Sequence, residues 1–174
     1  MILCVELTAL ATYRPSDRPY TVSEYNHPYP NVYGAEGQPM LHAYGAFQDW
    51  DGLIGHAYHN RQDVEPDNLA YHFTYASRTD ALAHSIACAT MFLRKDVKES
   101  KEQYVQHLPR KVFEDYWKKR LTHKISDLMH LASDYTFSRR HRLYHRVAVD
   151  MYAEECKSFP KEKIENVMYS DGGQ

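Results

Sequence analysis

The chain has 174 residues, of which 43% are hydrophobic and 25% are charged, and its formal net charge at pH 7 is −2. This balance predicts a globular protein that can bury a core, and it lacks the excess of basic residues that typifies nucleic-acid-binding proteins. No apolar run reaches the length of a membrane span, and Glu6 interrupts an apolar start that no basic segment precedes, so we expect no membrane or nucleic-acid partner and no secretory signal. The sequence does not indicate the cellular compartment of the protein.

The first informative segment is a short extended run that ends in a turn-rich stretch. Tyr20–Val22 favours extended backbone, whereas Pro28 and Pro30 cannot continue a ladder of hydrogen bonds and direct the chain outward. The run therefore predicts a strand with the carboxylate of Glu24 near its C-terminal end.

A helix and a second strand follow. Residues 39–50 carry apolar or aromatic side chains at one-face helical spacing, with Pro39 in the first turn, where proline is tolerated. Residues 52–58 form a short, nearly continuous apolar run, which suits a parallel sheet covered on both faces better than an exposed hairpin. The order strand, helix, strand predicts an α/β fold.

Four segments within residues 18–98 form a recognisable set: Ser23-Glu-Tyr-Asn-His-Pro-Tyr-Pro-Asn31, Ala35-Glu-Gly37, Phe47-Gln-Asp-Trp-Asp-Gly52 and Asp80-Ala-Leu-Ala-His-Ser-Ile-Ala-Cys-Ala-Thr-Met-Phe-Leu-Arg-Lys-Asp-Val97. With these segments, residues 18–98 resemble the C-terminal half of the catalytic barrel of clan A glycoside hydrolases, and are most similar to bacterial enzymes of families 42 and 5. In that clan the nucleophilic glutamate stands at the end of barrel strand seven, and Glu24 falls on this position.

The resemblance implies a partial (β/α)8 TIM barrel, made of its last two β/α units, followed by a mixed helix-and-strand extension. A whole barrel typically needs about 250 residues, so strands one to six are expected to be missing. The polar stretch Lys98–Lys101 predicts a boundary between a barrel part, residues 1–98, and an appended, truncated α+β region, residues 99–174.

The resemblance also implies a function: retaining hydrolysis of β-glycosidic bonds, with Glu24 as nucleophile and no cofactor. This chemistry needs a second carboxyl group about 5–5.5 Å away, and the clan's acid/base glutamate on strand four has no counterpart here. Glu36 follows the first strand, whereas Asp49 and Asp51 are expected at the opposite end of the sheet. The alternative is a non-catalytic remnant that binds carbohydrate or a partner chain.

The candidate substrate-binding residues lie after the two strands. Asn26 and His27 share the turn of Glu24 and either hydrogen-bond a sugar hydroxyl or fix the loop through side-chain to backbone bonds. Tyr58 and His59 end the second strand at the same barrel mouth, where Tyr58 suits a sugar platform or donor. His56 is either a ligand contact or a core histidine.

Metal binding is not expected. Cys4, Cys88 and Cys156 are too widely spaced for a zinc motif or a disulfide framework. His141 and His145 have helical ligand spacing, but their basic segment runs into an apolar, strand-like stretch and is interpreted as a solvated edge.

Residues 110–132 carry a strong apolar stripe at three- and four-residue spacing. The pattern predicts an amphipathic helix that needs a partner surface, so association through this helix is expected.

Overall fold

The computed structural model describes residues 3–59, 72–111, 114, 118 and 139–154. These belong to two compact units, a central unit of residues 20–99 and a terminal unit of residues 1–19 and 100–174. The expected boundary after residue 98 lies next to the end of the central unit, but the first nineteen residues, expected in the barrel part, group with the C-terminal part instead. Most of the helix expected at 110–132 lies outside the described residues.

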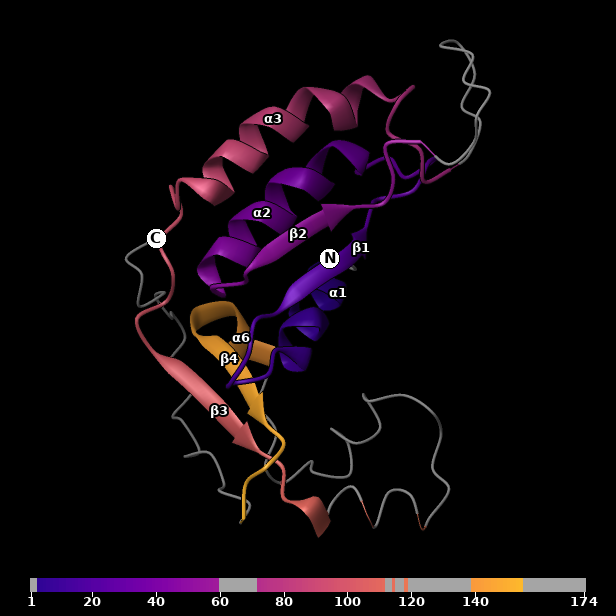
Figure 1. The fold of residues 1–174 in the computed structure, drawn as a ribbon. Coiled ribbons are helices and arrows are strands. Elements are labelled where there is room, and N and C mark those ends of the chain that lie inside the picture. The colour runs from indigo at the N-terminus through magenta and orange to yellow at the C-terminus, as the bar shows by residue number, and fades with distance from the viewer. Residues whose placement is uncertain (1–2, 60–71, 112–113, 115–117, 119–138, 155–174) are drawn as a thin grey trace. The chain divides into compact units, whose positions relative to one another are not determined.

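The central unit is built as strand, helix, strand, helix (Figure 1). Its elements are β1, Thr21–Tyr25; a short 3-10 helix, Gly34–Glu36; α2, Gly37–Phe47; β2, Gly52–Gly55; and α3, Thr79–Leu93.

β1 and β2 are paired in parallel, which confirms the order and the strand direction that the sequence predicts. β2 is shorter than the expected 52–58 run. A two-stranded sheet is present in both a partial barrel and other α/β folds, so the barrel stays a hypothesis.

The helices of the central unit pack side by side (Figure 1), and α2 also contacts the sheet. The rings of His42 on α2 and Phe92 on α3 meet edge to face, with centroids 6.2 Å apart. A Cβ built on Gly45 would lie 3.0 Å from the Leu53 side chain, so this glycine lets α2 approach β2 closely. Trp50 is buried beside Tyr44 of α2.

The connection from α2 to β2 is a tight reversal. Asp49, two residues after the last residue of α2, has φ of 56°, a left-handed conformation that aspartate tolerates better than most residues. Asp51 then bonds the chain before β1 twice, since its N–H donates to the Tyr20 carbonyl at 2.9 Å and its carboxylate accepts from the Tyr20 N–H at 2.8 Å. The start of β1 is thereby tied to the start of β2, at the end opposite Glu24.

The terminal unit contains α1, Leu3–Leu10; a 3-10 helix, Ala11–Tyr13; β3, Gln103–His107; α6, Arg139–Tyr144; and β4, Arg146–Asp150. β3 and β4 are parallel over five residue pairs. The N-terminal segment bonds β4, since the Ser16 N–H donates to Val149 O and the Val149 N–H donates to Arg14 O. These bonds explain why the first nineteen residues belong to this unit.

Candidate functional site

Glu24 lies at an irregular point of β1. Val22 pairs with Leu53 and Tyr25 pairs with Gly55, so two residues of β1, Ser23 and Glu24, stand opposite one residue of β2. A β-bulge of this kind re-aims the side chains of the bulged residues. Glu24 is exposed, and no hydrogen bond or ion pair joins its carboxylate to another described residue. The carboxylate is thus presented to solvent near the C-terminal end of a parallel strand.

Asn26 connects the ends of the two strands. Its amide nitrogen donates to the carbonyl of His56, at 2.9 Å, and to that of Phe73, at 2.6 Å. Of the two roles that the sequence leaves open for Asn26, the structure shows the one that fixes the loop, because both amide hydrogens are engaged with backbone.

His27 lies inside the unit, with 3% of its surface exposed. Its Nδ1 is 3.2 Å from the carbonyl oxygen of Tyr33, which can only accept, so Nδ1 carries the proton. Its Nε2 therefore accepts from the Tyr25 hydroxyl, at 2.8 Å. Of the two roles that the sequence leaves open for His27, the structure shows the internal one, since both ring nitrogens are bonded within the protein.

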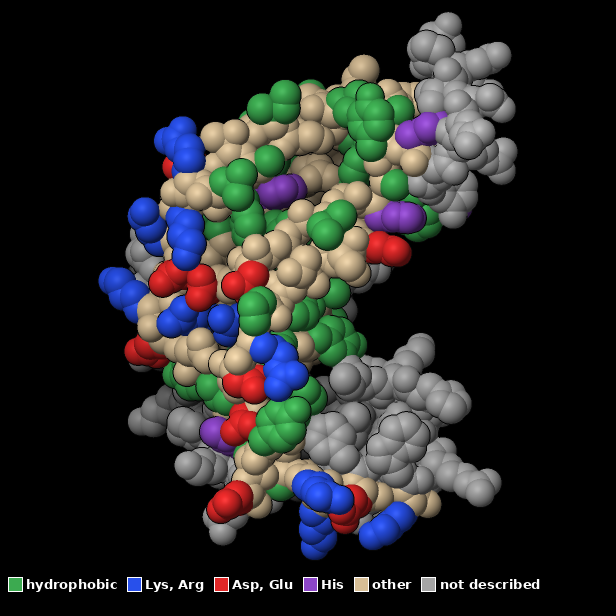
Figure 2. All heavy atoms as spheres, in the orientation of Figure 1, with side chains coloured by type: hydrophobic (Ala, Val, Ile, Leu, Met, Phe, Trp, Pro, Cys, Tyr) green, Lys and Arg blue, Asp and Glu red, His purple; other side chains and the backbone are tan. Residues whose placement is uncertain are grey.

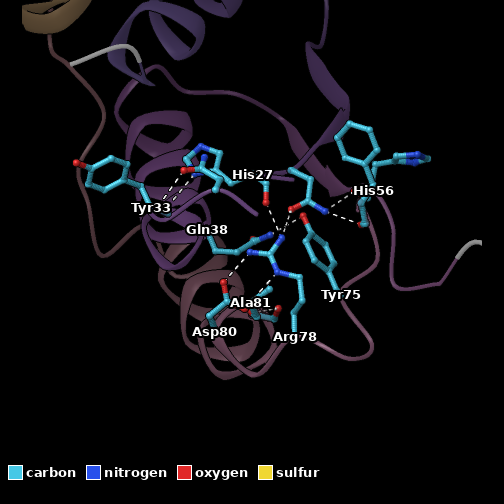
Figure 3. Close-up of polar contacts among 12 residues, drawn as sticks. His27, Tyr33, Gln38, His56, Tyr75, Arg78, Asp80 and Ala81 are labelled. Carbon is cyan, nitrogen blue, oxygen red and sulfur yellow. Dashed lines mark hydrogen bonds and ion pairs between the residues drawn. The ribbon is translucent and has the colours of Figure 1, made fainter. Parts of the chain in front are cut away.

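Arg78, which sequence reasoning missed, is the central charge of the loop behind Glu24 (Figure 3). Its side chain is 4% exposed and makes a two-point ion pair with Asp80, at 2.6 and 3.2 Å. The same guanidinium donates to the His27 carbonyl, at 2.5 Å, and to the Asn26 side-chain oxygen, at 3.5 Å. Bonding to Arg78 lowers the pKa of Asp80, so the pair is charged at neutral pH.

Tyr75, also missed, fixes the last residue of β1. Its hydroxyl donates to the Tyr25 carbonyl and accepts from the Gln38 side-chain amide, both at 2.8 Å. Burial raises the pKa of Tyr75 to about 12, so the hydroxyl keeps its proton and remains a donor over the physiological range.

Three glycines make room for these side chains. A Cβ on Gly37 would lie 2.7 Å from the His27 ring, and one on Gly55 would lie 2.6 Å from the Tyr75 ring. A Cβ on Gly34 would collide with the Arg78 guanidinium and lie 2.7 Å from Asp80 Oδ2. Real Cβ atoms essentially never approach other atoms within 3.0 Å, so each glycine permits part of the network.

The remaining predicted residues follow β2. The His56 ring is partly buried against Phe73, with centroids 5.9 Å apart, and its backbone bonds Tyr25 and Asn26. Tyr58 is 69% exposed, as a sugar platform requires. His59 is partly buried, and its ring nitrogens have no hydrogen-bond partner among the described residues.

Two further exposed tyrosines lie on the loop that follows β1. Tyr29 and Tyr33 are each 56% exposed, and the stick view shows the Tyr33 side chain directed away from the Arg78 network (Figure 3). The loop backbone is held while these rings stay free, because the Tyr29 N–H donates to His72 O and the Tyr33 N–H donates to Asn31 Oδ1.

Three other described carboxylates of the central unit are engaged away from Glu24. Asp49 pairs with Lys95, Asp80 pairs with Arg78, and Asp51 caps the start of β1. Glu36 is exposed at the start of α2. Among the described carboxylates, Glu36 is thus the nearest in sequence to Glu24 that no ion pair engages.

The basic segment of the terminal unit differs from the solvated edge that its sequence predicts. It forms the helix α6, and His141 is 8% exposed, packed against Tyr104 together with His145. The histidine ring centroids are 6.4 Å apart. Among the described residues, no three histidine, cysteine or carboxylate side chains converge as a metal site.

Charge is mixed on the surface. On the face that Figure 2 draws, acidic and basic side chains are interspersed rather than gathered into one field of a single sign. No helix within the described ranges has the length and apolar character needed to cross a bilayer.

Comparisons with known proteins add no relative: no family model, no curated protein and no solved structure matches the chain. The site is therefore interpreted from its own geometry.

Sequence reasoning missed Arg78, Tyr75 and Gln38 because each acts through a partner far along the chain. One local signal is visible for Arg78, which stands two residues before Asp80 where α3 begins, a spacing that permits an ion pair at the helix start. No local signal identifies Tyr75 among the fifteen tyrosines of the chain.

Proposed function

We propose that the central unit supplies the nucleophile side of a retaining β-glycosidase, with Glu24 as the nucleophile. The observation that carries this proposal is the exposed Glu24 carboxylate, set in a bulge near the C-terminal end of a parallel strand and followed by a cross-linked loop. Catalytic residues of parallel α/β proteins gather at the C-terminal ends of strands. The resemblance of residues 18–98 to clan A glycoside hydrolases supports the same role.

In this proposal Glu24 attacks the anomeric carbon. A bond forms between a carboxylate oxygen and that carbon while the bond to the leaving oxygen breaks, which gives a covalent glycosyl-enzyme and an alcohol that must receive a proton. Water then releases the sugar with retained configuration. The exposed tyrosines Tyr29, Tyr33 and Tyr58 offer ring faces and hydroxyls for a pyranose.

The acid/base step is the part that the described residues do not supply in a paired form. Among the described carboxylates, Glu36 is the candidate for this role if the chain acts alone, and a further polypeptide segment is another source. The lack of a carboxylate paired with Glu24 among the described residues favours a second candidate function, in which the central unit binds carbohydrate through its exposed tyrosines without hydrolysing it.

The two functions separate under a reagent that needs no acid catalyst. Dinitrophenyl 2-deoxy-2-fluoro-β-glycosides carry a leaving group that departs without protonation, and the fluorine slows release, so a nucleophile alone accumulates as the glycosyl-enzyme. We expect the gluco, galacto or manno reagent to label the full chain once, on the peptide that contains Glu24, as read by mass spectrometry.

Glu24→Gln should abolish labelling, and Glu36→Gln is the matched control that should be labelled like the wild type. Oligosaccharide binding without any label would support the carbohydrate-binding function and reject the glycosidase. Label on another carboxylate would show that the nucleophile is misassigned.

A further inference from the structure

We infer that Arg78 and Asn26 are positioning residues that set the reactivity of Glu24. This inference rests on the proposed function and extends it to residues that touch no substrate. Residues 25–27, directly after Glu24, each accept a hydrogen bond from the side chain of Tyr75 or Arg78 (Figure 3).

A chain of hydrogen bonds joins Arg78 to the ends of both strands. The Asn26 amide nitrogen donates to the carbonyls of His56, at 2.9 Å, and Phe73, at 2.6 Å, and the Arg78 guanidinium donates to the amide oxygen, at 3.5 Å. The ends of β1 and β2 are thus tied through the Asn26 side chain, and Arg78 holds that side chain from its oxygen side.

The bonds from Arg78 to the loop are buried or partly buried. The Arg78 side chain is almost fully removed from solvent, and its pairing with Asp80 compensates its charge. Charge-assisted bonds in a buried site are shorter and stronger than neutral bonds at a surface. The loop behind Glu24 is therefore held more firmly than a surface ion pair would hold it.

The β-bulge makes the position of Glu24 depend on the residues that follow it. A bulged residue lacks the regular ladder on its own strand, so the direction of the Glu24 carboxylate depends on what fixes the residues that follow. Tyr25 is fixed by the Tyr75 hydroxyl, and Asn26 and His27 are fixed by Arg78. Small misplacements of a reacting group are costly in rate, about a hundredfold for 1 Å.

The test measures the rate of labelling of Glu24 by the fluoroglycoside in the full chain. We expect Arg78→Met to lower the maximal labelling rate constant at least tenfold while the reagent concentration at half-maximal rate changes less than threefold. Arg78→Lys keeps the charge without the two-point fork and should recover only part of the rate.

Arg94→Met is the matched control, because Arg94 also pairs with an aspartate two residues later, Asp96, but at an exposed position on the same unit. It should label like the wild type. Amide hydrogen exchange should show lost protection in residues 26–33 for Arg78→Met and no change for Arg94→Met.

If Arg78→Met does not fold, Asn26→Ala decides, since it removes the middle link and leaves the ion pair in place. A folded Arg78 or Asn26 variant that labels within twofold of the wild type overturns the positioning role. Failure of the wild type itself to be labelled overturns the proposed function, and the positioning role with it, so the two failures are distinct.

Discussion

The close approach of Gly55 to Tyr75 yields a prediction whose size follows from the structure. In Gly55→Ala, the added Cβ would lie 2.6 Å from Tyr75 Cε2, whereas ordinary contact begins at 3.4 Å. The buried ring must retreat by roughly 0.8 Å, and it is held by two 2.8 Å hydrogen bonds, from Gln38 and to Tyr25.

The cost combines strain and lost bonds. Overpacking a core costs about 1–3 kcal/mol, and each hydrogen bond disrupted costs about 1 kcal/mol, whereas replacing glycine returns about 0.4–1 kcal/mol through the unfolded chain. We expect Gly55→Ala to lower the free energy of unfolding of the central unit by about 2–4 kcal/mol.

Gly52→Ala in the same strand is the matched control. Its Cβ would lie 3.1 Å from the side chain of Thr21, which is exposed and can rotate away, so the expected change is within about 0.5 kcal/mol. Urea unfolding is followed by the fluorescence of Trp50, in a Trp117→Phe background so that only the central unit reports.

A double-mutant cycle isolates the contact. In a Tyr75→Ala background the ring is absent, and Gly55→Ala should then cost no more than Gly52→Ala. Equal shifts for the two glycines in the parent, or an unchanged Gly55→Ala cost without the ring, would refute the reasoning.

Three further outcomes are expected. The pKa of Tyr75 is about 12 in the folded protein, so Tyr75 contributes about 2–3 kcal/mol to the free energy of unfolding below pH 10, and this contribution is lost as pH rises through 12. Tyr75→Phe should flatten the alkaline part of the curve of stability against pH, measured by urea unfolding. The pKa of Asp80 is lowered in the folded protein, so Asp80 contributes stability above its usual pKa of 3.8, and this stability is lost as pH falls through the lowered pKa. Asp80→Asn should therefore weaken the acid dependence of hydrogen exchange in its loop. An unchanged acid dependence would contradict this role. Burial raises the pKa of the Cys88 thiol, and in a Cys4→Ser, Cys156→Ser background alkylation near pH 8 should be at least tenfold slower than in urea; equal rates would show that the thiol is accessible.

The sequence predicts the elements of the central unit well where local patterns decide them. β-branched and aromatic residues mark β1, and helical spacing with an early Pro39 marks α2, whose bounds differ from the expected ones by two or three residues. The parallel pairing follows from the order of elements, since a strand, a helix and a strand close most readily in parallel. These features depend on residues close together in the chain.

The site is predicted only in part, because several of its features depend on residues far apart in the chain. The position of Glu24 near the end of a strand is local, whereas the bulge that presents it depends on the register against β2. His27 stands in a proline-rich turn that suggests exposure, yet its burial depends on Gly37, which leaves room for the ring. Arg78 and Tyr75 reach partners about fifty residues earlier in the chain, and no periodic pattern carries such information.

The terminal unit is completed by two distant stretches of chain, and this affects the order in which the protein can fold during synthesis. Arg142, which bonds the Thr8 carbonyl, lies 134 positions after Thr8, and this stretch takes about 7–27 s to translate at about 5–20 residues per second. The central unit is contiguous and is complete once residue 99 has left the ribosome. The N-terminal segment must wait for β4, at residues 146–150, so the bonds of Arg14 and Ser16 to Val149 cannot form until most of the chain has been synthesised.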